Sequence, residues 1–536
     1  MSGQGTTTGG ASVVAFALCA WSASTSTACT YSDACWEVFV CAPDPEPPPG
    51  PCEGEPWTAP ALDECGVFVS SEHGDDDNPG TKDAPVKTLQ RAVGLAASGR
   101  GGGASPTRRV YACGGAFEEA ITLPSGVDLW GGRLCDGGDW SPGGPDQRTT
   151  IAPPAGVPLR VLQGEDATST ISGVRAVAAE GSAIDGKSSI AVILSYGGKA
   201  RLVSSVVVAG NGKDGEPGED APSVRAQGGP LGNNGADACT ADAATGALPV
   251  VTACGEGIES TGGYGGDGGI ERGGDGASGQ PEPAPNPEGK GLGGAGAGST
   301  ACSDGNDGAP GADRGRAGGA AGIGYLTADG WIGVRGDDGE RGGIGQAGGG
   351  GGGSKSRDGV SLPVCPASRP QTGAAGGSGG GGGCGGLGGK GGGYGGASIG
   401  IVALEGTELT VEATEVLTGR GGNGGTGGTG QPGGFGNQGG YGGRGFVTGM
   451  WNACHGGYGG NGGRGGDAGG GLGGPSIGIA YVAPNLALRP GALITVGAAG
   501  EGGLAGNAGA NDVAGKGGSG PSAQTQAFSG PNELPR

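Results

Sequence analysis

Glycine recurs at every third position over two long stretches of this chain, and a second glycine usually follows each one. The unbroken register runs from Gly421 to Gly445 and, upstream, from Gly373 to Gly391. A period of three fits neither a β-strand nor an α-helix; it is the period of the polyproline II helix, which has no internal hydrogen bonds. Glycine on two of three faces would let such helices approach closely and hydrogen-bond laterally. We therefore expect a scaffold of bundled helices whose remaining side chains point outward.

The composition supports a scaffold more than an ordinary globular core. The 536 residues include 141 glycines and 36 prolines, and only 4% are aromatic, which leaves few large apolar side chains to bury. Ordering so much glycine is entropically expensive, so cross-links are expected to help. The formal net charge of −21 argues against a nucleic-acid partner, because phosphate binding needs clustered Lys and Arg.

The 14 cysteines are the candidate cross-links. They are scattered through Gly- and Pro-rich sequence without tight CxxC pairs and with only two histidines, which favours a disulfide framework in an oxidising compartment over a zinc site. We expect Cys113 to pair with Cys135 and Cys239 to pair with Cys254, because each pair brackets one short excursion of the chain.

The amino terminus resembles an export leader. Ala11–Ala20 is a short apolar run, followed by small polar residues and then Cys29, a candidate for lipidation. The pattern is imperfect, since no Lys or Arg precedes the run and Ser26 stands where a lipidation motif has Leu. An apolar start of a mis-assigned reading frame is the alternative. With Cys19 removed and Cys29 lipidated, twelve cysteines would remain, an even number.

A mixed region of strands and one helix follows the leader. Val67–Ser70 has the character of a strand, and Val86–Ala97 carries apolar residues at the i, i+3, i+4, i+7 spacing of an amphipathic helix, with Thr88 as its cap. Short strand candidates then alternate with turns as far as Val208.

One strand opening occurs three times. Ser189–Val192, Ser398–Ile401 and Ser476–Ile479 share a Ser-Ile start, each is followed by further apolar runs, and each unit then passes into glycine-rich sequence. Similar units without helices between them predict successive coils of a solenoid that stack to complete a common core. The glycine-rich blocks would then be insertions that leave the coils at one corner.

Residues 70–97 (SSEHGDDDNPGTKDAPVKTLQRAVGLAA) and 108–132 (RRVYACGGAFEEAITLPSGVDLWGG) carry a family resemblance. They resemble the cap and first coils of right-handed parallel β-helix proteins of the pectate-lyase-like class, and especially exported surface proteins of gliding bacteria with glycine-rich interruptions. The glycine blocks are similar in style to PGRS surface proteins and to glycine-rich antifreeze proteins. The resemblance implies an all-β fold, a right-handed parallel β-helix with glycine-rich polyproline II-type insertions.

These patterns predict eight segments. They are an export signal at 1–28, a Cys/Pro-rich tether at 29–66, the β-helix cap and first coils at 67–211, a glycine-rich insertion at 212–390, a coil at 391–420, an insertion at 421–470, a coil at 471–498 and a glycine-rich tail at 499–536.

The sequence contains no recognisable catalytic, cofactor or metal site. Asp75–Asp77 are the densest acids, but they lie in a turn-rich loop; a surface Ca²⁺ site is the alternative. Gly262–Asp267 and Gly462–Asp467 match the start of a GGxGxD calcium repeat but lack its apolar residue and its tandem copies. Glu405, Glu408, Glu412 and Glu415 lie in one unit without counterparts in the others. Tyr394, Tyr441 and Tyr458, each in a GGYGG setting, either stack on sugars or cover glycine backbone.

The function expected from the sequence is therefore a non-enzymatic structural or adhesive scaffold. It would be exported to the outer membrane, the cell surface or the medium, with membrane attachment through lipidated Cys29, and its partner would be an extracellular polysaccharide or a surface protein. The alternative is a carbohydrate-binding or polysaccharide lyase- or hydrolase-like enzyme, which rests on the fold resemblance alone.

Overall fold

The computed structural model describes residues 50–99, 108–357 and 365–530. The chain divides into two units, Met1–Gly50 and Pro51–Arg536, and the second contains all the elements described below. Cys29 and the expected leader lie outside the described residues. Within those residues, no helix has the length and apolar character that a membrane crossing requires.

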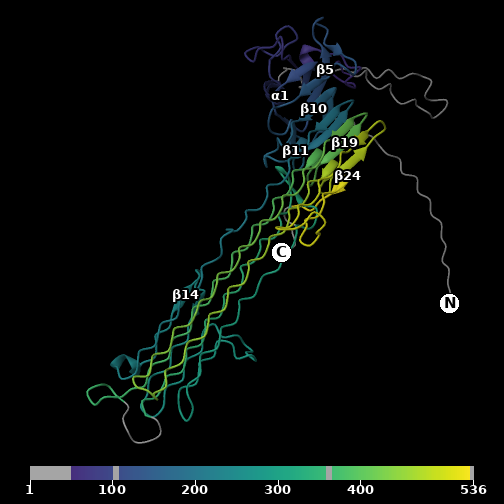
Figure 1. The fold of residues 1–536 in the computed structure, drawn as a ribbon. Coiled ribbons are helices and arrows are strands. Elements are labelled where there is room, and N and C mark those ends of the chain that lie inside the picture. Colours follow the sequence, from purple (N-terminus) through teal and green to yellow (C-terminus); the bar gives the residue numbers. More distant parts are fainter. Residues whose placement is uncertain (1–49, 100–107, 358–364, 531–536) are drawn as a thin grey trace, which may run out of the picture. The chain divides into compact units, whose positions relative to one another are not determined.

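Three parallel sheets, here called A, B and C, contain most of the strands of the unit (Figure 1). Sheet A contains, in spatial order, β1 (Val67–Val69), β2 (Arg109–Cys113), β5 (Asp128–Leu134), β9 (Ser169–Ser172), β12 (Lys199–Val203), β19 (Glu408–Glu412) and β22 (Asn485–Leu488), with the short β6 (Ser141–Pro142) antiparallel to β5. Sheet B contains β3 (Gly115–Phe117), β7 (Thr149–Ile151), β10 (Val174–Ala178), β13 (Val206–Ala209), β20 (Glu415–Thr418) and β23 (Leu493–Thr495). Sheet C contains β4 (Ile121–Pro124), β8 (Leu159–Leu162), β11 (Ser189–Leu194), β18 (Ser398–Ala403), β21 (Ser476–Tyr481) and β24 (Ser522–Ala527).

The chain visits the sheets in the repeating order C, A, B, so each circuit is one coil of a parallel β-helix. The repeated Ser-Ile strands stack directly: Ile399 of β18 pairs with Ile190 of β11 on one side and Ile477 of β21 on the other. Further along the same strands, Ile401 pairs with Val192 and Ile479, and these three side chains lie in the β-helix core, so stacking in register completes that core. The stacked Ile190, Ile399 and Ile477 belong to a separate apolar cluster that includes Leu326 and Trp331. The predicted fold class is confirmed.

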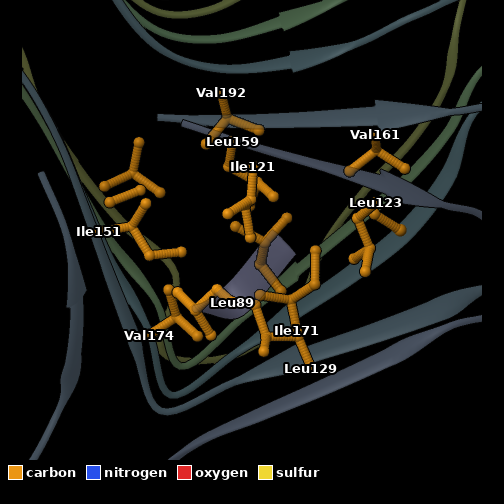
Figure 2. Close-up of a cluster of buried hydrophobic side chains, with 14 of the residues drawn as sticks. Leu89, Ile121, Leu123, Leu129, Ile151, Leu159, Val161, Ile171, Val174 and Val192 are labelled. Atoms are coloured by element: carbon orange, nitrogen blue, oxygen red, sulfur yellow. The ribbon is translucent and has the colours of Figure 1, made fainter. Parts of the chain in front are cut away.

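Alternate strand residues point into the β-helix and form its core. Figure 2 shows part of it, where Leu123, Leu129, Ile151 and Leu159 from three sheets meet. Helix α1 (Leu89–Ala97) closes the first coils, and its buried residues are the four predicted from the periodicity, Leu89 among them. The Thr88 side chain accepts a hydrogen bond from the Arg91 amide, so the predicted cap is confirmed.

The opposite face of sheet A is covered by residues 51–66. The ring side chains of Phe68, Tyr111 and Trp130, on three neighbouring strands, form a second cluster with Ala59 and Ala61 of this segment. The Cys52–Cys65 disulfide closes the segment, which ends in the 3₁₀ turn Asp63–Cys65. The carboxyl end of the expected tether is therefore part of the folded unit.

Every glycine-rich block leaves the β-helix at the same corner. The blocks lie between β13 and β18, between β20 and β21, and between β23 and β24, and each time the chain leaves sheet B and returns to sheet C. The first block also contains two hairpins, β14 (Val251–Ala253) with β15 (Glu259–Thr261) and β16 (Tyr325–Thr327) with β17 (Gly330–Ile332), and the 3₁₀ turn Ala241–Ala244. The expected tail also differs from a plain glycine-rich segment, because it ends in strand β24 of sheet C.

The glycine-rich segments run side by side and are joined by backbone hydrogen bonds that repeat every three residues (Figure 1). Segment 373–396 has neighbours on all sides. Its amides point in three directions, toward segments 213–236, 454–472 and 263–269. Representative hydrogen bonds are Gly393 N to Glu216 O (2.8 Å), Gly386 N to Gly463 O (3.0 Å) and Gly379 N to Gly263 O (2.9 Å). This is the lateral bonding predicted from the period of three.

The close approach of these helices requires glycine. A Cβ atom at Gly388 would lie 1.8 Å from the carbonyl oxygen of Gly339, and one at Gly389 would lie 2.1 Å from that of Gly428. Leu387, the third residue of the same turn, is exposed. Two residues in each of these turns therefore face neighbouring backbone. The third position carries an outward side chain at Leu387, whereas Ala375, Ser378 and Cys384 at the same position of earlier turns are buried.

Five disulfides cross-link the described residues. Cys113 is bonded to Cys135, as predicted. The predicted Cys239–Cys254 pair is wrong: Cys239 is bonded to Cys365 and Cys254 to Cys384, while Cys302 is bonded to Cys454. Lateral bundling is the physical reason, because it places each cysteine beside a helix that is 126 to 152 residues away in sequence. Such a framework is typical of an oxidising, exported location.

Candidate functional site

Four glycine helices lie side by side and form one outward face of the bundle. Their order is 211–238, 420–445, 452–474 and 303–320, as the backbone hydrogen bonds between neighbours show. One bond from each contact is Gly215 N to Asn423 O (2.7 Å), Gly459 N to Asn437 O (2.8 Å) and Gly308 N to Tyr458 O (2.8 Å). Because each chain has three residues per turn, every third side chain points away from the bundle.

We call these outward side chains the display face. Members that are three residues apart along one helix stand about 9 Å apart, the rise of three residues of a polyproline II helix. They are Asn211, Asp214, Pro217, Asp220, Asn234 and Asp237 on the first helix; Asn423, Thr426, Thr429, Pro432, Phe435, Gln438, Tyr441 and Arg444 on the second; Asn452, His455, Tyr458, Asn461 and Arg464 on the third; and Asp304, Asp307, Pro310, Asp313 and Arg316 on the fourth.

The Asp and Asn side chains of the display face have a structural task. Each accepts a hydrogen bond from a backbone amide of a neighbouring helix, either of an outward residue or of a glycine such as Gly436 or Gly445. Examples are Asn423 N to Asp214 Oδ1 (2.7 Å), Thr429 N to Asp220 Oδ1 (2.7 Å), Tyr458 N to Asp307 Oδ1 (2.8 Å) and Arg464 N to Asp313 Oδ1 (2.6 Å). Hydrogen bonds from the Thr429 amide and hydroxyl hold the pKa of Asp220 below its ordinary value. Part of the acidity of this chain is therefore used to cap its backbone.

The same capping explains the two calcium-like motifs. The Asp467 carboxylate, which is buried, accepts hydrogen bonds from the Gly430 amide (2.9 Å) and the Arg464 guanidinium (2.6 Å). Burial would raise the pKa of Asp467, but these hydrogen bonds outweigh it and the pKa lies below its ordinary value. Asp267 similarly accepts from the Gly246 amide at 2.7 Å. In the described ranges, no group of three or more potential metal ligands is found.

The display face also carries aromatic rings that are more than half exposed. These are Phe435, Tyr441 and Tyr458. The rings are held in place by neighbours: the Arg225 guanidinium lies 4.1 Å from the Phe435 ring centre, and the rings of Tyr441 and His455 meet edge to face at 5.3 Å. His455 Nδ1 accepts from the Gly442 amide at 3.0 Å, so His455 is a structural cap as well.

Tyr394, which is also in a GGYGG setting, lies outside the display face. Tyr394 packs edge to face on Trp331, with ring centres 5.5 Å apart, so it covers backbone and core. Burial, followed by the charge of Asp185, raises the pKa of Tyr394. The sequence did not distinguish these tyrosines, because whether a tyrosine ring is exposed or packed depends on which helices have a neighbour on their outer side.

The remaining acidic candidates take part in local structure. Asp76 accepts hydrogen bonds from the Thr88 and Lys87 amides, and Asp75 accepts from the Asp77 amide, which fits the turn expected there. Glu408 and Glu412 of β19 form ion pairs with Lys199 and Arg201 of the adjacent strand β12.

Comparisons with known proteins add little to this geometry. No protein-family model and no curated protein matches the chain. Two crystal structures of GH136 lacto-N-biosidase from Eubacterium ramulus are similar to part of it. The selenomethionine derivative is 16% identical over 26% of this chain and 26% of that chain, with a TM-score of 0.19; the native protein is 16% identical over 25% and 26%, with a TM-score of 0.12. The chain thus spans about a quarter of that enzyme, a likeness that says nothing about activity.

Proposed function

We propose that this chain is an exported, non-enzymatic surface scaffold whose display face holds an extracellular polysaccharide. The observation that carries the proposal is the placement of Phe435, Tyr441 and Tyr458, more than half exposed, within a lattice of amide, carboxylate and guanidinium groups. Aromatic faces pack against the apolar faces of sugar rings, and polar side chains beside them supply hydrogen bonds to hydroxyl groups.

The hydrogen-bonded bundle gives this face its rigidity. Side chains held at regular spacing lose little conformational freedom on binding, so many weak contacts along one polymer add to useful avidity. In this proposal Cys29 is the lipidated residue that attaches the chain to a membrane, and the β-helix is the base from which the bundle projects.

Removal of the three rings is expected to abolish polysaccharide binding. The full oxidised chain would be tested by affinity electrophoresis through gels containing a neutral β-glucan, a xylan or an acidic alginate, with Phe435→Ala/Tyr441→Ala/Tyr458→Ala as the variant. Tyr196→Ala/Tyr264→Ala is the matched control, because both tyrosines are exposed but lie outside the display face. Retardation by a glycan that is lost in the triple variant and kept in the control supports the proposal. No retardation by any gel, or equal retardation of both variants, overturns it and favours a surface protein as the partner.

A further inference from the structure

A cavity of about 340 Å³ lies beside the outer face of sheet A, outside the glycine helices. The Pro56–Trp57 turn of the disulfide-closed segment forms one wall, and the end of β5 with the loop after β6 forms the others. The lining residues that could contact a ligand through their side chains include Trp57, Arg133, Gln147, Arg148, Ser172 and Ser204.

Arg133 is the unusual member of this lining. Its side chain is 2% exposed, and it donates to the carbonyls of Pro56 (2.7 Å) and Trp140 (3.4 Å). Its Nε has no hydrogen-bond partner, and among the described residues no carboxylate forms an ion pair with it. Burial lowers the pKa of Arg133 to about 10. The Arg133 Cζ atom also lies 5.3 Å from the Tyr111 ring centre and 5.5 Å from the Trp130 ring centre, so two rings and two carbonyls offset part of its charge. A buried cation without an anionic partner is still costly, and an anionic ligand would offset the rest of its charge.

Arg148 adds a second cation to the same cavity. It donates from Nη1 to Pro145 O at 2.7 Å, within its own loop, and its Nε is also buried without a partner. The cavity lining contains no Asp or Glu, although the whole chain has 52 acidic against 31 basic residues. The cavity therefore has a positive character that the rest of the composition does not predict.

The other walls fit a small organic molecule. Trp57 is half exposed and stands with Pro142 and Pro145 as an apolar side of the cavity. Gln147, Ser172 and Ser204 supply amide and hydroxyl groups. A ligand with one anionic end and a neutral polar body would match both sides.

We propose that this cavity is a binding site for a phosphate or sulfate ester of a small polar molecule, with Arg133 and Arg148 on the oxyanion. Arginine is the side chain best suited to planar, charge-assisted recognition of such groups. The inference is independent of the display face and of the proposed polysaccharide.

Calorimetric titration of the full oxidised chain tests the site. The probes are glucose 6-phosphate, glucose 6-sulfate, inorganic phosphate, inorganic sulfate and glucose. We expect an ester to bind and glucose not to bind, and Arg148→Gln to weaken the ester by about tenfold or more. Arg175→Gln is the matched control, because Arg175 is exposed on β10 and lies outside the cavity lining.

Arg133→Gln is expected to abolish binding, and its thermal unfolding shows whether the variant is folded. Arg148→Gln keeps the test decisive if it is not, because the Arg148 contact lies within one surface loop. Binding of the inorganic ions alone would overturn the organic ester and leave an oxyanion site. Absence of binding by every probe, or equal binding by the Arg148 and Arg175 variants, would overturn the site itself.

Discussion

Alanine in place of Gly388 is expected to destabilise the glycine bundle while the β-helix stays folded. The added Cβ would lie 1.8 Å from the Gly339 carbonyl oxygen, which is backbone and cannot rotate away. Overpacking of this kind costs roughly 1–3 kcal/mol or more, and here it also breaks the local lateral hydrogen bonds. Urea unfolding followed by hydrogen exchange of the bundle segments would measure the loss.

The control for this variant is Leu387→Ala at the neighbouring position. Leu387 is exposed, and its backbone hydrogen bond with Gln431 survives truncation of the side chain. We expect little change in its free energy of unfolding. Equal stability of the two variants would mean that the tight contacts around segment 373–396 do not exist.

Loss of one long-range disulfide is the second large effect expected. The Cys254–Cys384 bond closes 130 residues, and the chain-entropy model gives a bond of that span about 5 kcal/mol of stability. We expect Cys254→Ser/Cys384→Ser to lower the melting temperature of the bundle strongly, because a glycine-rich chain has much conformational freedom to lose. Differential scanning calorimetry of the full chain measures this change.

The Cys113–Cys135 bond provides the comparison. It closes only 22 residues, for which the same model gives about 3 kcal/mol, and it lies in the β-helix. Cys113→Ser/Cys135→Ser should therefore destabilise the β-helix coils and leave the bundle transition in place. A bundle transition that is insensitive to the loss of Cys254–Cys384 would contradict the pairing.

Local periodicity was sufficient to predict much of this architecture. The register of Gly373 to Gly391 determined the three-residue helices, and the recurring Ser-Ile strands predicted stacked coils. The spacing of Leu89, Ala92, Val93 and Ala96 gave α1 and its cap. Each of these features depends on residues that lie within a few positions of one another, so it can be predicted from one sequence.

Lateral register was the part that the sequence did not predict. Cys239 and Cys254 bracket a short stretch, yet the bundle turns them toward Cys365 and Cys384, because their neighbours are set by how the helices pack. The same holds for Tyr394, which packs against the apolar cluster around Trp331 while the otherwise similar Tyr441 faces outward.

The arginine cavity was also missed, although the sequence carried a signal for it. Phe68, Tyr111 and Trp130 alternate with core residues on strands β1, β2 and β5, so their rings had to point to the face that an uncovered sheet would give to solvent. That pattern predicts a covering segment, and residues 51–66 supply it. Arg133 lies on the same face, and residues 51–66 bury its side chain; the sequence alone did not show that this segment folds over the sheet.

Amide hydrogen exchange of the oxidised protein tests the central claim most directly. The comparison is between residues 421–445 of the bundle and residues 398–417 of the β-helix, measured in one sample. Because the glycine amides donate to neighbouring helices, both stretches should be protected from exchange. Within 421–445 we expect the slowest exchange at every third amide, from Gly422 to Gly443, because these amides donate to the central segment 373–396. Free exchange throughout 421–445, beside protected strands β18 to β20, would contradict a hydrogen-bonded bundle and the rigid display face built on it.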